Sequence, residues 1–290
     1  MPDARPTDES ADRRERWALV LGASSGFGAA SAIALAEAGY PIVGVHLDMR
    51  SSLPAVEQVK ARIAAAGVPV HFHNANAADE EKRRAVVASI GALFEERRAA
   101  GADPFIAVFL HSLAFGTTLP YVTTDPGRKE VSQKQLEMTV DVMAHSMVYW
   151  VRDLFHAGLI AEGSRLFAMT SEGAIKNVPT YGPVSASKAA LESHCRQLAM
   201  ELISHGITVN CIRAGVTDTP ALRRIPGHQE LLDHAMLRNP AGRITTPEDV
   251  GQAIVALASP RLYWMTGNSI GVDGGELIGT RQNYPLDDKG

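Results

Sequence analysis

The sequence predicts a single-domain α/β fold with a doubly wound parallel sheet. Short apolar runs alternate with longer segments of helical periodicity along most of the chain, the pattern of strands joined by crossover helices. The first apolar run, 17–21, leads directly into a glycine-rich turn and then into an Ala- and Leu-rich helix. A length of 290 residues is compatible with one domain of this class.

Composition and charge favour a protein that acts on small molecules. The chain is 46% hydrophobic and 21% charged, which is ordinary for a globular protein, and no basic stripe accompanies its net charge of -4. We therefore expect neither nucleic acid nor membrane as a partner. No apolar run reaches the roughly 18 to 20 residues of a membrane span, and the N-terminus lacks an apolar signal core, so we expect a cytoplasmic protein.

Cysteine and histidine spacing gives no sign of a disulfide framework or a metal site. Cys195 and Cys211 fall on a predicted helix and a predicted buried strand, which indicates reduced thiols in the core. His71 and His73 share one face of a predicted strand, but no third ligand accompanies them. We expect no bound metal.

The turn after the first strand is the candidate phosphate-binding site. Its three glycines permit a tight turn, close approach of the backbone to a pyrophosphate, and close packing of helix on strand. The following helix, which extends to residue 38, directs the unpaired N–H groups of its first turn at that phosphate. The predicted cofactor contacts in this turn are Gly22, Ser24, Ser25, Gly26, Phe27 and Gly28.

The end of the second strand, 41–45, should meet the adenosine ribose of a dinucleotide. An acidic residue there favours NAD(H), whereas an Arg accommodates the 2′-phosphate of NADP(H). His46, Asp48 and Arg50 all lie in the loop that follows. Because Asp48 stands late for the ribose and Arg50 with Ser51 suits a phosphate, we expect NADP(H) rather than NAD(H).

The remaining elements continue the βα rhythm. Strands are expected at 68–73, 105–110, 164–170, 208–212 and from 269, with helices at 53–66, 79–100, 133–158, 183–205 and from 247. Sheets of this kind bind ligands beyond the carboxyl ends of their strands. Segments at that edge supply the further candidate cofactor contacts Asn76, Ala77, His111, Ser112 and Leu113.

Other segments frame a single domain at 16–279. The polar stretch 1–15 is interpreted as a mobile tail, and 280–290 as a second tail. The stretch 217–245, with several Pro and Gly around a short helix, is interpreted as a flap over the substrate. The long predicted helix carries an apolar stripe, which we assign to the core or to a subunit contact; it includes Met143, Met147 and Trp150.

The stretch after the fifth strand carries the candidate catalytic groups. Ser171 supplies a hydroxyl, Tyr181 a phenol and Lys188 an ammonium around the start of a predicted helix. Tyr181 stands just before that helix and Lys188 in its second turn, so we expect both on the same side. The set is a proton donor with a cation to tune it.

The chain resembles the short-chain dehydrogenase/reductase family across 16–279. The matching motifs are the glycine turn, Ser171 ahead of Lys188, Ala-Gly-Val-Thr-Asp-Thr at 214–219 and Val-Asp-Gly-Gly at 272–275. Most members place their Tyr four residues before the Lys, where this chain has Val184. Tyr181 instead gives Tyr-x6-Lys, which is similar to the bacterial enoyl-acyl-carrier-protein reductases.

Further motifs are similar to that subgroup. They are His111-Ser-Leu-Ala, Asp141-Val-Met and Asn239-Pro-Ala-Gly-Arg, the last typical of its NADPH-dependent branch. One departure from the wider family is Leu21 in place of the usual Thr of the glycine turn.

The resemblance implies NAD(P)H-dependent reduction of the C=C bond of 2-enoyl thioesters on acyl carrier protein or coenzyme A, as in fatty acid synthesis, by a homotetramer or homodimer. Tyr181 would reach the thioester oxygen, and Ser171 would hydrogen-bond the substrate or Tyr181. Lys188 would hold the nicotinamide ribose and make the phenol more acidic. The backbone at Gly215 and Val216 would contact the carboxamide, and Thr219 the phosphate.

Two alternatives stay open at this point. One is a carbonyl or alcohol oxidoreductase of the 3-ketoacyl reductase type whose Tyr has shifted. The other is a dinucleotide-binding protein without catalysis.

Overall fold

A seven-stranded parallel sheet forms the centre of the molecule, as predicted. The computed structural model describes residues 14–225 and 227–279. The strand order is β3-β2-β1-β4-β5-β6-β7, and every neighbouring pair is parallel. The strands are β1 (Glu15–Leu21), β2 (Ile42–His46), β3 (Val70–Asn74), β4 (Pro104–His111), β5 (Arg165–Ser171), β6 (Thr208–Ala214) and β7 (Ser269–Val272).

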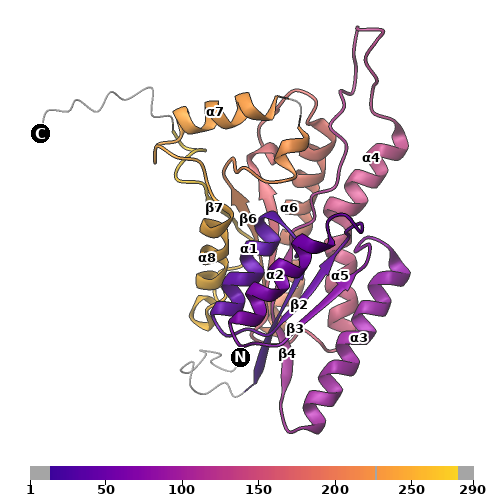
Figure 1. Cartoon of the computed structure of the whole chain (residues 1–290), viewed down its shortest axis with the longest axis vertical. Coiled ribbons are helices and arrows are strands. Elements are labelled where there is room, and N and C mark those ends of the chain that lie inside the picture. Colours follow the sequence, from indigo (N-terminus) through magenta and orange to yellow (C-terminus); the bar gives the residue numbers. More distant parts are fainter. Residues whose placement is uncertain (1–13, 226, 280–290) are drawn as a thin grey trace, which may run out of the picture.

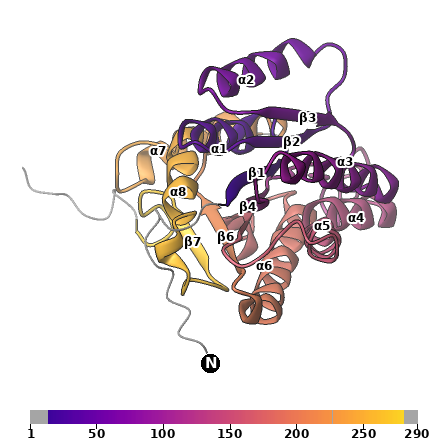
Figure 2. The same cartoon turned by 90° about the horizontal axis from the view of Figure 1, so that it is seen from below.

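Helices cover both faces of the sheet, which makes the fold doubly wound and of the Rossmann type (Figures 1 and 2). On one face lie α1 (Gly26–Glu37), α2 (Leu53–Ala65) and α8 (Pro247–Leu257). On the other lie α3 (Glu80–Ala99), α4 (Gln133–Val140), α5 (Ser146–His156) and α6 (Gly182–Leu202). A further helix, α7 (His228–Arg238), lies over the end toward which the strands point (Figure 1).

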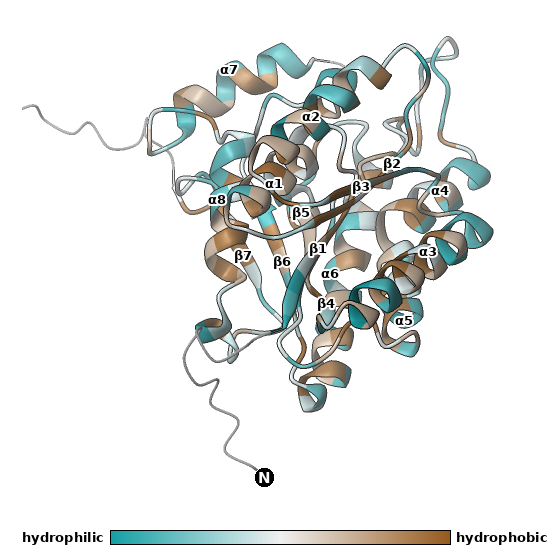
Figure 3. Cartoon of the chain, turned by 60° about the horizontal axis from the view of Figure 1, so that its bottom comes forward, coloured by the Kyte–Doolittle hydropathy of each residue, from teal (hydrophilic) through white to brown (hydrophobic). Residues whose placement is uncertain are grey.

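The side chains of β1 divide between two hydrophobic cores because successive residues of a strand face opposite ways. Trp17, Leu19 and Leu21 pack with the helices α3, α5 and α6, whereas Ala18 and Val20 pack with α1 and α8. Figure 3 shows the result as hydrophobic strands between helices whose outer turns are hydrophilic. A strand buried on both faces is apolar without alternation, which is why the sequence signal was a continuous run.

The first strand begins earlier than the sequence predicted. Glu15 belongs to β1, and its carboxylate accepts two hydrogen bonds from Arg97, at 2.7 and 3.0 Å. The boundary of the predicted tail at residue 15 is therefore wrong by at least one residue. The rest of that tail up to residue 13, and the second predicted tail at 280–290, lie outside the described residues.

The predicted helix 133–158 is two helices joined by a π-helical turn, Asp141–His145. The wider turn moves the helix register by a residue, and apolar spacing does not reveal such a change. The apolar stripe faces inward: Met143, Met147 and Trp150 are at most 3% exposed, and the indole N–H of Trp150 donates to Ala77 O at 2.8 Å. These side chains are core, so they do not support the subunit contact that the sequence also allowed.

No helix in the described part of the chain has the length and apolar character needed to cross a membrane. Cys195 and Cys211 are buried free thiols, in agreement with the sequence prediction.

Candidate active site

The carboxyl ends of β1 and β4 open the crevice in which a doubly wound sheet binds its ligand, because the chain leaves them in opposite directions. The backbone here is packed too closely for side chains. A Cβ on Gly22 would lie 2.4 Å from the carbonyl oxygen of Ser112, and one on Gly28 would lie 2.1 Å from that of Gly22. Gly22 also has a φ of +82°, so glycine is required there on two grounds.

The first turn of α1 has backbone N–H groups that can bind an anion. Its N-cap residue, Ser25, makes no capping hydrogen bond with its side chain, so the N–H groups of the turn are not satisfied by that hydroxyl. Gly26 brings the turn against the methyl group of Thr219, with a Cβ position 3.6 Å from Thr219 Cγ2. The structure thus brings together the predicted contacts from the glycine turn, from β4 and from the segment after β6.

The loop after β2 is built around Asp48. The Nδ1–H of buried His46 donates to the Asp48 carboxylate at 3.0 Å, since a carboxylate can only accept. Asn74, the last residue of β3, holds the backbone of Asp48 with two hydrogen bonds, one accepted from its N–H at 3.1 Å and one donated to its C=O at 2.9 Å. Arg50 is exposed on the same loop.

Asp48 is held in its ionised form beside the glycine turn. Its partial burial opposes ionisation, but hydrogen bonds from Ser24, Ser52 and His46 outweigh burial and lower the pKa of the carboxyl. The hydrogen bond with Ser24 places the carboxylate next to the turn that would hold the pyrophosphate. A negative charge at the end of the second strand is therefore a fixed property of this site.

Tyr181 and Ser171 meet across Gly173. A Cβ on Gly173 would lie 2.7 Å from Tyr181 Cε1 and 3.1 Å from Ser171 Oγ, so the ring lies over this glycine beside the hydroxyl. Ser171 Oγ also accepts from the N–H of Gly173 at 3.2 Å. Burial raises the pKa of Tyr181, and its hydrogen bond with Ser171 lowers the pKa in part. The phenol is a protonated group at the carboxyl end of β5.

Lys188 lies in the second turn of α6 with its ammonium inside the protein. It is 6% exposed, and Nζ donates to Met169 O of β5 at 2.6 Å. Burial lowers the pKa of Lys188 to about 8. The prediction that its charge makes Tyr181 more acidic is not met here, because the pKa of Tyr181 is raised and its only lowering influence is Ser171.

His111, at the end of β4, is a neutral interior residue. Its Nε2 lies 2.7 Å from Ser146 Oγ, and the Ser146 hydroxyl donates to Val142 O at 2.7 Å. The imidazole must therefore donate from Nε2, which leaves Nδ1 as a buried acceptor without a partner among the described residues. Burial, and then the charge of Lys188, lower the pKa of His111 to about 3.

The segment after β6 is covered by the carboxylate of Glu276. Glu276 Oε2 accepts from the N–H of Val216 at 3.1 Å and from Asn239 Nδ2 at 3.4 Å. Burial raises the pKa of Glu276, and the bond from Val216 opposes that rise. The predicted carboxamide contacts, Gly215 and Val216, therefore have an acid beside them that sequence reasoning did not identify.

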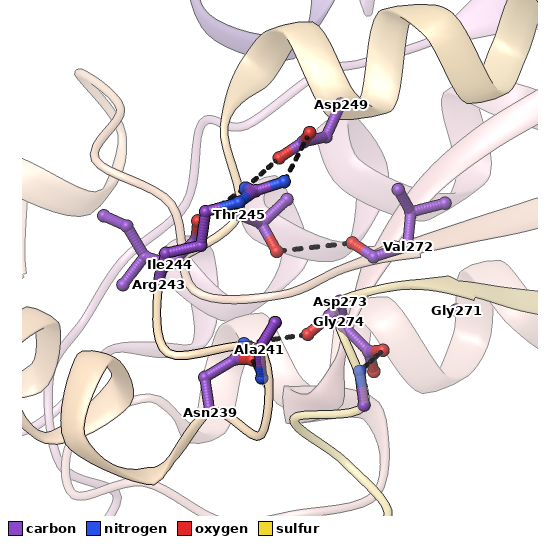
Figure 4. A pocket seen from close by; sticks show the side chains of 11 residues that line it. Asn239, Ala241, Arg243, Ile244, Thr245, Asp249, Gly271, Val272, Asp273 and Gly274 are labelled. Atoms are coloured by element: carbon purple, nitrogen blue, oxygen red, sulfur yellow. Dashed lines mark hydrogen bonds and ion pairs between the residues drawn. The ribbon is translucent and has the colours of Figure 1, made fainter.

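The predicted flap contains α7 and ends on a cavity of about 440 Å³ beside β7 (Figure 4). At the wall of this cavity the Arg243 guanidinium donates two hydrogen bonds to the Asp249 carboxylate, and Asn239 lies against the turn Asp273–Gly274. None of the predicted site residues lines it. Pro226 of the flap lies outside the described residues.

The remaining predicted contacts divide into two groups. Ser112 borders the glycine turn, and its N–H donates to Leu21 O at 3.0 Å; Leu113 Cδ2 lies 3.8 Å from the Cβ position of Gly22. The His111 ring instead faces α5, Ala77 is buried below Trp150, and Asn76 caps its own turn through a bond from Ala78 N. The side chains of this second group are engaged elsewhere. Any contact that these residues make with a cofactor would therefore come from their backbone atoms.

Sequence reasoning missed four residues that shape the site. Asn74 could have been found because β3 is parallel to β2 and ends beside it. Glu276 follows a strand and a Gly-Gly turn, which predicts a position at the carboxyl edge of the sheet. Tyr121 lies over the start of α6, since a Cβ on Gly182 would meet its ring at 2.7 Å. Thr180 has a φ of +65°, which no sequence pattern signals.

Comparison with known proteins identifies a matching family model and similar proteins. A family model described as enoyl-(acyl carrier protein) reductase matches residues 22–276. The enoyl-acyl-carrier-protein reductase (NADH) FabI of Aquifex aeolicus (strain VF5) is 32% identical over 59% of this chain and 62% of its own length. The 1-cyclohexenylcarbonyl-CoA reductase of Streptomyces collinus is 28% identical over 93% of this chain and 89% of its own.

A solved structure agrees in fold. The crystal structure of enoyl-acyl-carrier-protein reductase (NADH) from Aquifex aeolicus VF5 superposes with a TM-score of 0.75, at 24% identity, over 92% of this chain and 98% of that one.

Proposed function

The chain belongs to the enoyl-(acyl carrier protein) reductase family of short-chain dehydrogenases/reductases, and on that premise we propose that it reduces the C=C bond of 2-enoyl thioesters with NADH. The observation that carries the proposal is the placement of Tyr181. It is the phenol at the carboxyl end of β5, hydrogen-bonded to Ser171, while Val184 is buried at 5% exposure and has no proton to give. Val184 occupies the usual position of the Tyr, and Tyr181 stands nearly one helical turn before it. A phenol displaced in this way suits a substrate oxygen that lies further from the nicotinamide than the oxygen of a ketone would.

The glycine turn fits a dinucleotide. Gly22 and Gly28 keep the backbone free of side chains, and the first turn of α1 offers N–H groups to a pyrophosphate. Asp48 lies where a ribose would be bound, and Lys188 has two donors left on Nζ after its bond to Met169 O. The backbone of Gly215 and Val216 would contact the carboxamide and Thr219 the phosphate, while Ser112 and Leu113 border the same crevice.

The chemistry follows from where charge develops. When bound, the reduced nicotinamide supplies the hydride that adds to the β-carbon. Negative charge then develops on the thioester oxygen, where Tyr181 donates a hydrogen bond and stabilises the enolate. The raised pKa of Tyr181 keeps its proton in place at neutral pH, and Ser171 orients the phenol. Lys188 holds the ribose hydroxyls with the N–H donors that remain after its bond to Met169 O.

The Tyr181→Phe variant tests this role. We expect turnover of a 2-enoyl thioester to fall about 10²- to 10⁴-fold, the usual contribution of a positioned acid, with NADH binding retained. Tyr263→Phe is the matched control, because Tyr263 packs edge-on against Trp264 in the segment that Arg165 contacts at the amino end of β5, whereas Ser171 lies at the carboxyl end of that strand. Full activity of the Tyr181 variant would remove the phenol from the mechanism.

We propose NADH rather than the NADPH that the sequence favoured. The fixed carboxylate of Asp48 hydrogen-bonds a ribose 2′-OH but repels a 2′-phosphate, and His46 and Asn74 keep it in place. The name of the Aquifex relative, which specifies NADH, agrees with this.

Replacing the carboxylate tests the choice of coenzyme. Asp48→Asn should raise the ratio of NADPH to NADH activity, measured as kcat/KM, by at least about tenfold, since 1.4 kcal/mol of lost repulsion gives that factor. Asp103→Asn, at an exposed position before β4, is the control. A preference of the unmodified protein for NADPH would restore the phosphate-binding role to Arg50.

A further inference from the structure

Val216 already has a hydrogen-bond partner at the place assigned to the nicotinamide carboxamide. Its N–H donates to Glu276 Oε2 at 3.1 Å, and a Cβ on Gly215 would lie only 2.7 Å from the same oxygen. The carboxylate thus lies directly on the backbone after β6. This contact joins two segments that are 60 residues apart in the chain.

A tight turn fixes the position of Glu276. Gly274 and Gly275 have φ values of +61° and +85°, and Asp273 Oδ1 accepts from the N–H of Gly275 at 3.0 Å. Asn239, 1% exposed, donates to Asp273 O at 2.9 Å and accepts from Ala241 N at 2.9 Å. The turn is therefore attached to the end of the flap, as Figure 4 shows for Asn239, Asp273 and Gly274.

The surroundings of Glu276 disfavour the ionised form of its carboxyl group. Glu276 is half-buried, and the groups that face it are Glu172 from the segment after β5, Asp273 from its own turn, and the neutral Asn239. Lys176 pairs with Glu172 at 2.8 Å and neutralises only part of this charge. Burial, opposed by the Val216 bond and reinforced by Glu172, raises the pKa of Glu276.

We propose that Glu276 competes with the nicotinamide carboxamide for the N–H of Val216 and must leave it before the nicotinamide end of NADH can bind. The proposal rests on the proposed function through the assignment of Val216 to the carboxamide. One N–H makes one good hydrogen bond, so the two acceptors exclude each other. A protonated carboxyl is a weaker acceptor than a carboxylate, so NADH binds more tightly as the pH falls.

The competition is measured with two ligands that differ only in the nicotinamide. NADH and ADP-ribose are titrated into the wild-type protein, Glu276→Ala, Glu276→Gln and the control Glu96→Gln, which lies exposed on α3. Glu276→Ala should bind NADH roughly tenfold more tightly, the factor expected when a hydrogen bond to a charged group need not be broken. Glu276→Gln should lie between, and ADP-ribose affinity should not change in any variant.

A pH series provides the second readout. Wild-type affinity for NADH, relative to ADP-ribose, should rise as the pH is lowered and Glu276 takes up its proton, which happens at a higher pH than in a free carboxyl because its pKa is raised. The Glu276→Gln variant should show no such rise. A variant that fails to fold, detected by circular dichroism, leaves this wild-type series as the test.

The result that overturns the proposal is weaker or unchanged NADH binding by Glu276→Ala, which would make the carboxylate a ligand of the cofactor or a bystander. A wild-type protein that binds no NADH would overturn both this proposal and the proposed function. A protein that binds NADH as expected but reduces no enoyl thioester would contradict only the latter.

Discussion

The glycine turn and the loop before α6 both border the crevice, but different forces fix them. The turn is held by backbone contacts: Gly22 and Gly28 approach carbonyl oxygens so closely that no side chain fits. The loop is held by side chains, with the Tyr181 ring over Gly173 and hydrogen-bonded to Ser171. One region depends on the absence of side chains, and the other depends on contacts between side chains.

The largest effect should come from adding a side chain at Gly28, where the backbone of the glycine turn is in close contact with itself. In Gly28→Ala the new methyl group would lie 2.1 Å from Gly22 O, so the turn must open, and we expect NADH binding to be lost. Gly91→Ala on α3 meets nothing within 4 Å and should instead raise the free energy of unfolding by about 0.5–1 kcal/mol. Fluorescence titration with NADH and thermal denaturation measure both. Wild-type affinity in Gly28→Ala would show that close backbone approach does not define this region.

A smaller effect is expected from the buried imidazole of His111, at the end of β4. Unfolded histidine takes up a proton below its ordinary pKa of 6.5, whereas His111 in the fold does so only near 3. Falling pH in that window therefore favours the unfolded state, by up to about 1.4 kcal/mol per pH unit.

The His111→Asn variant should lose this part of the acid sensitivity. Urea unfolding of wild type, His111→Asn and the exposed control His234→Asn, measured from pH 7 to pH 4, compares them. Parallel curves for wild type and His111→Asn would mean that His111 titrates normally in the folded protein.

The smallest effect concerns the strained residue before the phenol. Thr180 has a φ of +65°, a conformation that is unfavourable for a β-branched side chain and that Asn tolerates. Thr180→Asn should raise the free energy of unfolding by about 1 kcal/mol, whereas Thr180→Val should give no gain. Denaturant unfolding of both variants decides this, and equal stabilities would argue that the backbone at 180 is not strained.

The two regions also differ in how much the sequence predicted. The alternation of strands and helices along the chain and the glycine turn followed from apolar runs and Gly spacing, because backbone geometry there depends on a few residue types. The π-helical turn at Asp141–His145 did not follow, since apolar spacing is nearly the same with one extra residue in a turn. Lys188 was predicted near Tyr181, but its bond to Met169 O depends on a side-chain conformation inside the core.

The remaining difference between the sequence prediction and the structure concerns charged side chains. Arg50 and Asp48 were both visible in the sequence, yet only the fold shows that His46 and Asn74 hold Asp48 while Arg50 is exposed. Glu276 came from a segment far along the chain, so no local pattern could place it on Val216.

The most direct test of the central claim is the oxidation of NADH with crotonyl thioester in one reaction and acetoacetyl thioester in another. The shifted phenol of Tyr181 predicts turnover of the crotonyl substrate, at a kcat/KM well above that for acetoacetyl. The carboxylate of Asp48 predicts faster turnover with NADH than with NADPH. Turnover of acetoacetyl thioester alone would mean that Tyr181 serves a carbonyl and would contradict the proposed enoyl reduction.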